Sequence, residues 1–221
     1  MADTTTGMAD ISTRPAPAAT AERPAHVVTA ATAATAATAA TAATAERPAQ
    51  VLVICTGNAA RSVMAGFMLE HLAARRGLPL DVATAGTHSV DGQPMSPRTR
   101  AGLASIDALR PVAYARHRSH QLLDHDLQRA TLVVAMEADH VRYVRHRHRA
   151  AAARTATIRA LVGALVPGPT PLADRVAALR LDLARPDEMA DVPDPAGGDE
   201  PEYVACAAQL WALCQELVTR L

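Results

Sequence analysis

The pattern of apolar and polar positions from Val51 onward predicts strands that alternate with helices. Four short apolar runs, rich in β-branched residues, are typical of buried strands: 51–55, 80–86, 131–136 and 155–158. Apolar residues at helical spacing predict helices over 62–76, 97–109, 137–149, 174–184 and 203–221. This order predicts an α/β fold, namely a single three-layer domain whose central, parallel, four-stranded sheet is flanked by helices.

The first 50 residues have a different pattern. They are mostly Ala, Thr and Pro, and the sequence TAERPA occurs at 20–25 and again at 44–49. A repeat of Ala and Thr has no large apolar face whose burial would offset the entropy lost on ordering. The sequence therefore predicts a low-complexity, disordered extension over 1–50 and a folded domain over 51–221. An extension without a function is the simpler interpretation, and an interaction tail is the alternative.

Charge and cysteine content narrow the class of protein. The 22 basic residues, all of them Arg, balance 22 acidic ones, so no bulk charge favours nucleic acid or an anionic membrane as a partner. No run of 18 apolar residues predicts a membrane span, and no Leu-rich core predicts a signal peptide. The odd count of 3 cysteines fits a reducing compartment. We expect a cytoplasmic protein, from a GC-rich and hence bacterial genome; the sequence does not indicate its oligomeric state.

The candidate chemistry lies where the first predicted strand ends, at Cys55. The small residues TGNAA separate Cys55 from Arg61, and Ser62 begins the next helix. Backbone N–H groups of such a loop can converge on one anion, and the positive end of the helix favours the thiolate form of the cysteine. Arg61 can donate two parallel hydrogen bonds to an oxyanion, and the Ser62 hydroxyl can donate to the sulfur.

The predicted anion site consists of Cys55 as nucleophile followed by Thr56, Gly57, Asn58, Ala59, Ala60, Arg61 and Ser62. Gly57 and Asn58 tolerate the left-handed backbone that a tight loop requires. The alternative is that Cys55 is an inert cysteine at the end of a strand. Spacing alone does not decide, because Cys214 and Arg220 have the same separation. Cys214 lies on an apolar helical stripe with no preceding strand or glycine, so we expect it in the core.

The segment CTGNAARS resembles the C-x5-R-S phosphate loop of the low-molecular-weight protein tyrosine phosphatases, especially the bacterial branch often labelled arsenate reductase/protein-tyrosine phosphatase. The resemblance continues in order over 84–103, 130–144 and 191–198, and so covers 51–221. It implies a phosphatase I-like fold and metal-independent hydrolysis of a phosphomonoester, protein phosphotyrosine foremost, through a cysteinyl-phosphate. The implied substrate is a phosphorylated protein or a small phosphoester.

The resemblance also implies a general acid, and Asp194 matches the family's late Asp-Pro motif. Pro193 and Pro195 stiffen its loop, whereas Asp191 is the less favoured acid because no proline follows it. Taken alone, Asp194 is equally typical of a turn or a helix cap. In the implied mechanism Cys55 attacks phosphorus, Asp194 protonates the leaving group and then activates water, and Arg61 stabilises the equatorial oxygens.

No cofactor or metal is expected, because Arg61 and backbone dipoles supply the positive field. The histidines do not predict a ligand set: His146 and His148 face apart on a helix, and His117 and His120 lack partners, so all are expected to be solvated. The basic cluster 142–149 predicts a solvated helical face, with a patch for an acidic substrate or partner as the alternative.

Departures from the family pattern leave the substrate open. Ala60 stands where members carry a second loop cysteine, so the resemblance implies that this chain lacks that redox guard. Many members carry aromatic rings beside the cleft and after Asp-Pro that sandwich the substrate ring, but the stretch after Thr84 has no aromatic residue and Pro195 leads to Ala-Gly-Gly. Phosphoarginine or a smaller phosphoester is therefore an alternative substrate. Arsenate reductase with an external thiol is a rival function, since Cys206 and Cys214 are about 12 Å apart along one helix and too far to bridge. A non-catalytic phosphate-binding module is a second rival.

Overall fold

The computed structural model describes residues 48–110, 114–186 and 191–221. Residues 1–47 of the predicted extension lie outside the described residues. The first strand, β1 (Ala49–Cys55), begins two residues before the apolar run that predicted it.

The central sheet has four strands, all parallel, in the order β2-β1-β3-β4. The other three strands are β2 (Leu80–Gly86), β3 (Leu132–Ala135) and β4 (Thr155–Thr157). This confirms the predicted fold class. Because β1 lies inside the sheet, its side chains alternate between two apolar cores: Val51 and Val53 enter one, and Leu52 and Ile54 the other.

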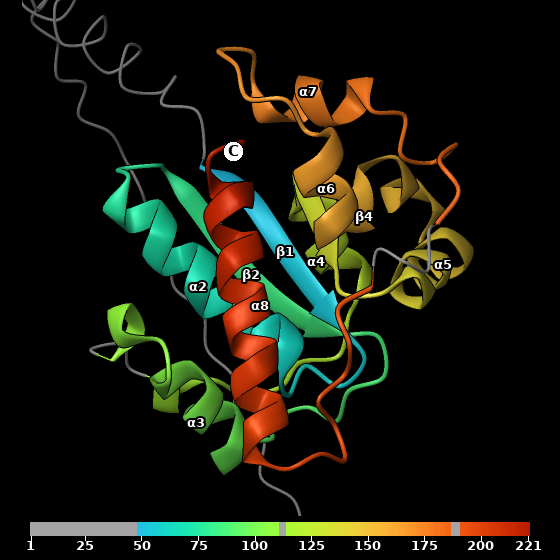
Figure 1. Cartoon of the computed structure of the whole chain (residues 1–221). Helices are drawn as coiled ribbons and strands as arrows, with labels where there is room; N and C mark the ends of the chain where they lie inside the picture. Colours follow the sequence, from blue (N-terminus) through green and yellow to red (C-terminus); the bar gives the residue numbers. More distant parts are fainter. Residues whose placement is uncertain (1–47, 111–113, 187–190) are drawn as a thin grey trace, which may run out of the picture. The chain divides into compact units, whose positions relative to one another are not determined.

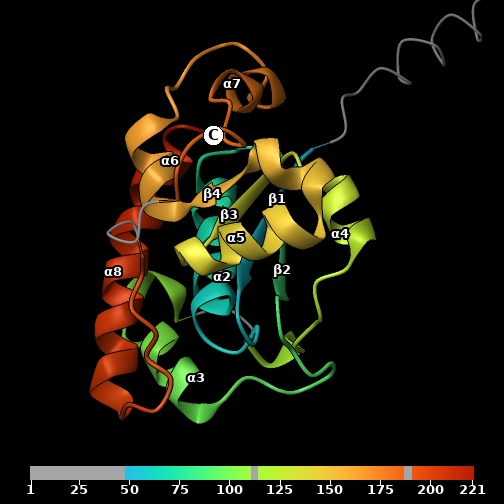
Figure 2. The same ribbon diagram turned by 90° about the vertical axis from the view of Figure 1, so that its right-hand side faces the viewer.

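Helices cover both faces of the sheet, as Figures 1 and 2 show. On the face of Val51 and Val53 pack α2 (Arg61–Arg75), α3 (Pro97–Ala104), α6 (Ile158–Ala164), α7 (Leu172–Ala178) and α8 (Glu200–Val218). The opposite face is covered by α4 (Asp124–Arg129), α5 (Ala138–Arg147) and the 3-10 helix η3 (Arg149–Arg154). Two further 3-10 turns, η1 (Asp107–Leu109) and η2 (Tyr114–Arg116), follow α3.

Several predicted helix boundaries are wrong. The helix predicted over 97–109 ends at Ala104 and is followed by η1. The one predicted over 174–184 is α7, which ends at Ala178 because Arg180 adopts a left-handed φ of 48°. Two short helices, α4 and α6, were not predicted, since six or seven residues make too few turns for a periodic signal. No helix of the described part is both long and apolar enough to cross a bilayer.

Cys214 is fully buried in α8, which confirms that this second Cys-Arg pair belongs to the core. Cys55 occupies a different position, at the carboxyl end of the interior strand β1, opposite Gly86 of β2. Ligands of open parallel sheets bind beyond this edge. The fold thus places the loop after Cys55 where a binding site is expected.

Candidate active site

The loop from Cys55 to Arg61 connects β1 directly to α2 and is tightly enclosed. Gly86, at the end of β2, lies against it: a Cβ atom there would stand 2.6 Å from the Thr56 carbonyl oxygen and 2.8 Å from the Asn58 nitrogen. Only glycine fits this close approach without displacing the loop. The neighbouring strand therefore fixes the path of the loop.

Every carbonyl group of residues 56–60 accepts a hydrogen bond from outside the loop. The donors, in order along the loop, are the His88 N–H, the Ser89 hydroxyl, His117 Nε2, the Thr99 hydroxyl and the Met64 N–H. In contrast, the backbone N–H groups of the same five residues donate to no acceptor within the described residues. A loop whose carbonyls are all held and whose amides are all free is an anion-binding nest.

A chain of hydrogen bonds leads from Asn58 to the sulfur of Cys55. Asn58 adopts a left-handed φ of 49°, and its side-chain oxygen accepts from the His120 N–H at 2.9 Å. Its Nδ2 donates to the Ser62 hydroxyl at 3.0 Å, and the Ser62 oxygen lies 3.0 Å from Cys55 Sγ. Because an amide nitrogen only donates, the Ser62 oxygen accepts there and its own proton is directed at the sulfur. The Ser62 hydroxyl is therefore placed to donate a hydrogen bond to Cys55 Sγ.

Arg61, the first residue of α2, is 1% exposed, and its charge is balanced by two carboxylates. Nη1 donates to Glu137 and, at 3.0 Å, to the Val192 carbonyl oxygen, while Nη2 donates to Asp194 Oδ2 at 2.6 Å. Arg61 Nε is buried and has no acceptor among the residues described. An unsatisfied, buried guanidinium N–H beside a row of free amides requires an acceptor, and an oxyanion supplies one.

His140 supports the loop from α5. Its Nδ1 accepts from the Glu137 N–H at 3.1 Å, so the ring proton of the neutral form is on Nε2, which lies 3.0 Å from the Thr56 hydroxyl. Burial, together with the nearby charge of Arg61, lowers the pKa of His140 to about 4. The imidazole is therefore neutral at neutral pH and donates to Thr56.

The two candidate acids have different surroundings. Asp191 Oδ1 accepts from the Ala138 N–H at 2.7 Å, so this carboxylate binds the first turn of α5. Asp194 is 39% exposed, beside Arg61, and its second oxygen accepts from the Ala196 N–H at 3.1 Å. Asp194 is thus the one of the pair that lies next to the loop with an open side toward solvent.

The other two cysteines, Cys206 and Cys214, are buried like Cys55, and all three are free thiols. Cys206 lies beneath the Asp194 loop, with its sulfur 3.9 Å from the Pro193 carbonyl oxygen, and burial raises its pKa to about 11. Burial likewise raises the pKa of Cys214. Neither thiol is disposed to act as a nucleophile at neutral pH.

The expectation that the histidines are solvated is wrong for His117 and His148. His117 is half-buried, bonded to the loop at the Asn58 carbonyl, and burial lowers its pKa. The His148 side chain is 13% exposed and pairs with Asp124. His120 does not lack partners either: it lies with His125 and Asp126, whose ligand atoms are all within 4.8 Å of one another. Both imidazoles bond to the Asp126 carboxylate, which accounts for the grouping without a metal.

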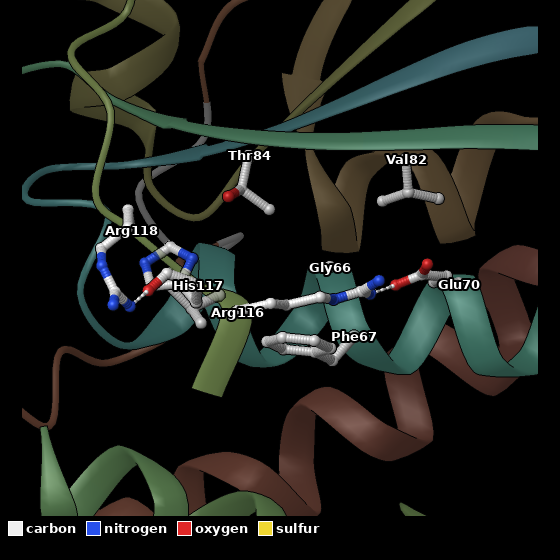
Figure 3. A pocket seen from close by; sticks show the side chains of 9 residues that line it. Gly66, Phe67, Glu70, Val82, Thr84, Arg116, His117 and Arg118 are labelled. Atoms are coloured by element: carbon white, nitrogen blue, oxygen red, sulfur yellow. Dashed lines mark hydrogen bonds and ion pairs between the residues drawn. The ribbon is translucent and has the colours of Figure 1, made fainter. Parts of the chain in front are cut away.

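A cavity of about 320 Å³ reaches the loop at His117 (Figure 3). Its walls are α2, the edge strand β2, and the end of η2 with the two residues that follow it. Arg116 lies across the cavity over the Phe67 ring and pairs with Glu70. Phe67 is 7% exposed and contributes to the wall. His117 lines this cavity and bonds to the Asn58 carbonyl, so one residue connects the cavity wall to the loop.

Fold and site together define a parallel α/β protein with a cysteine-based oxyanion loop. A sequence model of the low molecular weight phosphotyrosine protein phosphatases matches residues 50–221, and the chain belongs to that family. It is 27% identical over 175 residues to a protein-arginine-phosphatase of Geobacillus stearothermophilus, covering 79% of this chain and 97% of that one. It is also 31% identical over 101 residues to a probable low molecular weight protein-tyrosine-phosphatase, EpsP, of Ralstonia nicotianae, covering 45% and 63%.

Solved structures agree with this assignment. An arginine phosphatase from Geobacillus stearothermophilus superposes with a TM-score of 0.59 at 28% identity, covering 77% of this chain and 91% of the other. A low molecular weight protein tyrosine phosphatase from T. tengcongensis gives 0.61 at 26% identity, covering 78% and 99%. The recognised family and the predicted fold are therefore confirmed.

Sequence reasoning missed the residues that surround the loop. Glu137 immediately precedes α5 and His140 lies in its first turn, and the carbonyl-binding donors come from segments 87–89, 99 and 117. These are single polar residues far apart in the sequence, with no shared spacing. For segment 87–89, Glu137 and His140 a signal was available, because they follow predicted strands closely and side chains meet there at one edge of a parallel sheet. Thr99 and His117 follow no predicted strand closely, so no such signal marked them.

Proposed function

We propose that the chain is a metal-independent phosphatase that hydrolyses a phosphomonoester through a cysteinyl-phosphate at Cys55. The observation that carries the proposal is the loop 56–60, whose five carbonyls are all bonded outward while its five amides, with Arg61 Nε, have no acceptor among the described residues. Six donors without acceptors, in the loop that follows Cys55, suit the oxygens of a phosphoryl group.

In the proposed reaction the Cys55 thiolate, held by the Ser62 hydroxyl, attacks phosphorus as the bond to the leaving oxygen breaks. The amides of residues 56–60 and Arg61 bind the equatorial oxygens, whose charge grows in the transition state. The phosphoryl group takes the place of Asp194 on the guanidinium. The displaced Asp194 carboxylate takes up a proton from solvent, donates it to the leaving oxygen, and later removes a proton from the water that cleaves the phosphorus–sulfur bond.

The proposed substrate class is a phosphorylated protein, with phosphotyrosine as the first candidate because the family model carries that description. Phosphoarginine is the second, because the relative that aligns over 97% of its own length is a protein-arginine-phosphatase. The residues after Asp194 are Pro-Ala-Gly-Gly, so no ring flanks the acid in this stretch to sandwich a phosphotyrosine. This feature favours testing the two phosphoresidues side by side.

Arsenate reduction is the rival activity on this fold. A relay by internal disulfides needs resolving thiols that reach Cys55 as nucleophiles, whereas burial raises the pKa of both Cys206 and Cys214. Only a reductase that uses an external thiol fits these cysteines.

The test is hydrolysis of para-nitrophenyl phosphate in the presence of EDTA. We expect turnover by the full chain, loss of turnover in Cys55→Ser, and retention in Cys214→Ala, which removes a buried thiol outside the loop. Parallel assays with peptides that carry phosphotyrosine or phosphoarginine identify the substrate. Absence of hydrolysis combined with arsenate-dependent consumption of thiol would establish the reductase instead, and phosphate binding without either reaction would establish a binding module.

A further inference from the structure

Basic side chains line a hollow at the far end of α5. The cavity has a volume of about 220 Å³, and its polar walls are Arg147, His148, Arg149 and Arg154 with Asp124 and Gln128 of α4. Arg147 and Arg149 have no acidic or hydrogen-bond partner in the part of the chain that the structure describes. The single carboxylate, Asp124, already accepts from His148 Nδ1 at 2.6 Å. The hollow therefore carries an excess of positive charge.

The sequence predicted that residues 142–149 form a solvated helical face. That prediction does not account for this hollow. Basic residues in the last turn of a helix are stabilised by its dipole, which explains Arg147, but Arg149 and Arg154 belong to η3 beyond the helix. Arg145, in the same run, is not solvated: it donates to the Leu181 and Ala184 carbonyls. Arg154 Nε and His148 Nε2 are buried nitrogens without a partner in residues 114–186 or the other described segments. A buried guanidinium N–H requires an acceptor that the described protein does not supply.

The hollow is connected to the active-site loop along α5. Glu137, just before the helix, contacts Arg61, and Arg147 lies ten positions further on, about 15 Å along the axis. Three side-chain rings form a row along this direction. The ring centroids of His88 and Tyr143 are 5.3 Å apart, and those of Tyr143 and His148 are 5.7 Å apart. His88 contacts the active-site loop, because its backbone N–H donates to the Thr56 carbonyl. Figure 2 shows α5 with α4 beside it on this side of the sheet.

We propose that the hollow is a second anion subsite, which binds an acidic or phosphorylated side chain of the same substrate chain whose phosphoryl group enters the Cys55 loop. This inference rests on the proposed function and adds a sequence preference to it. An extended peptide advances about 3.3 Å per residue, so a span of about 15 Å places the second anion four or five residues from the phosphoresidue. The line of rings offers contact surface for the residues between.

The experiment compares peptides that carry one phosphoresidue, of the kind the enzyme hydrolyses. One set is neutral elsewhere, and the others have glutamate or phosphoserine four or five positions away on either side. We expect kcat/KM to be about tenfold higher for at least one anionic peptide, because two free guanidiniums pair with the added charge. The double variant R147Q/R149Q should lose this advantage and keep its activity on para-nitrophenyl phosphate and on the neutral peptide.

The matched control is R75Q/R76Q, which removes two exposed arginines at the other end of α2 and changes the net charge equally. If both double variants lose the kcat/KM advantage of the anionic peptides equally, diffuse charge attraction explains it and the subsite is overturned. Equal kcat/KM of the parent for neutral and anionic peptides would also overturn the subsite. Hydrolysis of para-nitrophenyl phosphate reports on the proposed function separately. If that activity is absent, fluorescence anisotropy of the same peptides with the Cys55→Ser chain tests the subsite by affinity, and equal affinity for neutral and anionic peptides would overturn it.

Discussion

Asp194 Oδ2 lies 2.6 Å from Arg61 Nη2, on the guanidinium that the proposed mechanism assigns to the phosphoryl group. In the proposed mechanism the Asp194 carboxylate and the phosphoryl group therefore compete for one cation. Substrate binding releases the carboxylate, which can then take up a proton and act as the proton donor. We expect Asp194→Ala to lower kcat for para-nitrophenyl phosphate by about 100-fold or more, the usual cost of losing a general acid. Inhibition by inorganic phosphate should be at least as strong as in the parent, because a competing carboxylate is gone.

The control for this change is Asp139→Ala, which removes an exposed carboxylate near the start of α5 whose described partner is Arg142. Steady-state kinetics at several phosphate concentrations give both quantities. Unchanged kcat in Asp194→Ala would mean that another group protonates the leaving oxygen.

The Ser62 hydroxyl directs its proton at Cys55 Sγ, and the sulfur should lose reactivity without it. We expect Ser62→Ala to slow alkylation of Cys55 by iodoacetamide at pH 7 by about tenfold, because a hydrogen bond to a charged group contributes about 1.5 kcal/mol or more. Ser105→Ala is a suitable comparison, since that hydroxyl bonds to the Gly102 carbonyl at the end of α3. Equal alkylation rates in the parent and in Ser62→Ala would contradict this assignment of the proton.

Gly86 has no space for a methyl group. We expect Gly86→Ala to displace the Thr56 carbonyl and the Asn58 amide, and to lower kcat/KM by about 100-fold through misplacement of the loop. Overpacking of this kind also costs about 1–3 kcal/mol of stability. Gly163→Ala, in α6, meets no atom within 4 Å and should leave both activity and stability close to the parent. Activity assays and urea unfolding measure the two effects.

His140 makes stability depend on pH in the acid range. Its folded-state pKa, about 4, is below the 6.5 of an unfolded histidine, so the unfolded chain binds the proton more readily between these values. Stability from this residue is complete above pH 6.5 and is lost as the pH falls toward 4, by up to about 3 kcal/mol. Urea unfolding of the parent and of His140→Asn at pH 7, 5.5 and 4.5 should give a shallower decline for the variant. Parallel declines would show that other groups carry the dependence.

The sequence was sufficient for the parallel sheet and the strand–loop–helix around Cys55, because each is a continuous segment with its own pattern. β2 was predicted residue for residue, and the arrangement of Gly57, Asn58, Arg61 and Ser62 after a strand identified the loop. Local patterns of this kind reflect local physics: buried strands need apolar runs, and an amide nest needs small residues.

The sequence did not predict the side-chain contacts between segments that lie far apart along the chain. The Arg145 side chain looked like part of a solvated basic face, yet it donates to carbonyls of residues 181 and 184, which follow α7. Glu137 looked like the start of a helix and is an ion-pair partner of Arg61. Such contacts depend on which elements the topology brings together, and the sequence near each residue carries no trace of that partner.

The loop carbonyls bond to segments outside the loop, so no short continuous peptide contains the whole site. A peptide of residues 49–76 would contain the nucleophile, the arginine, the strand and the helix, yet it would lack the donors at positions 88, 89, 99 and 117 that hold four of the five carbonyls. Without them nothing fixes the amides on the inner side of the loop. The proposed oxyanion hole is a property of the assembled domain, so fragments and circular permutants that separate these segments should bind phosphate only when all of them are reunited.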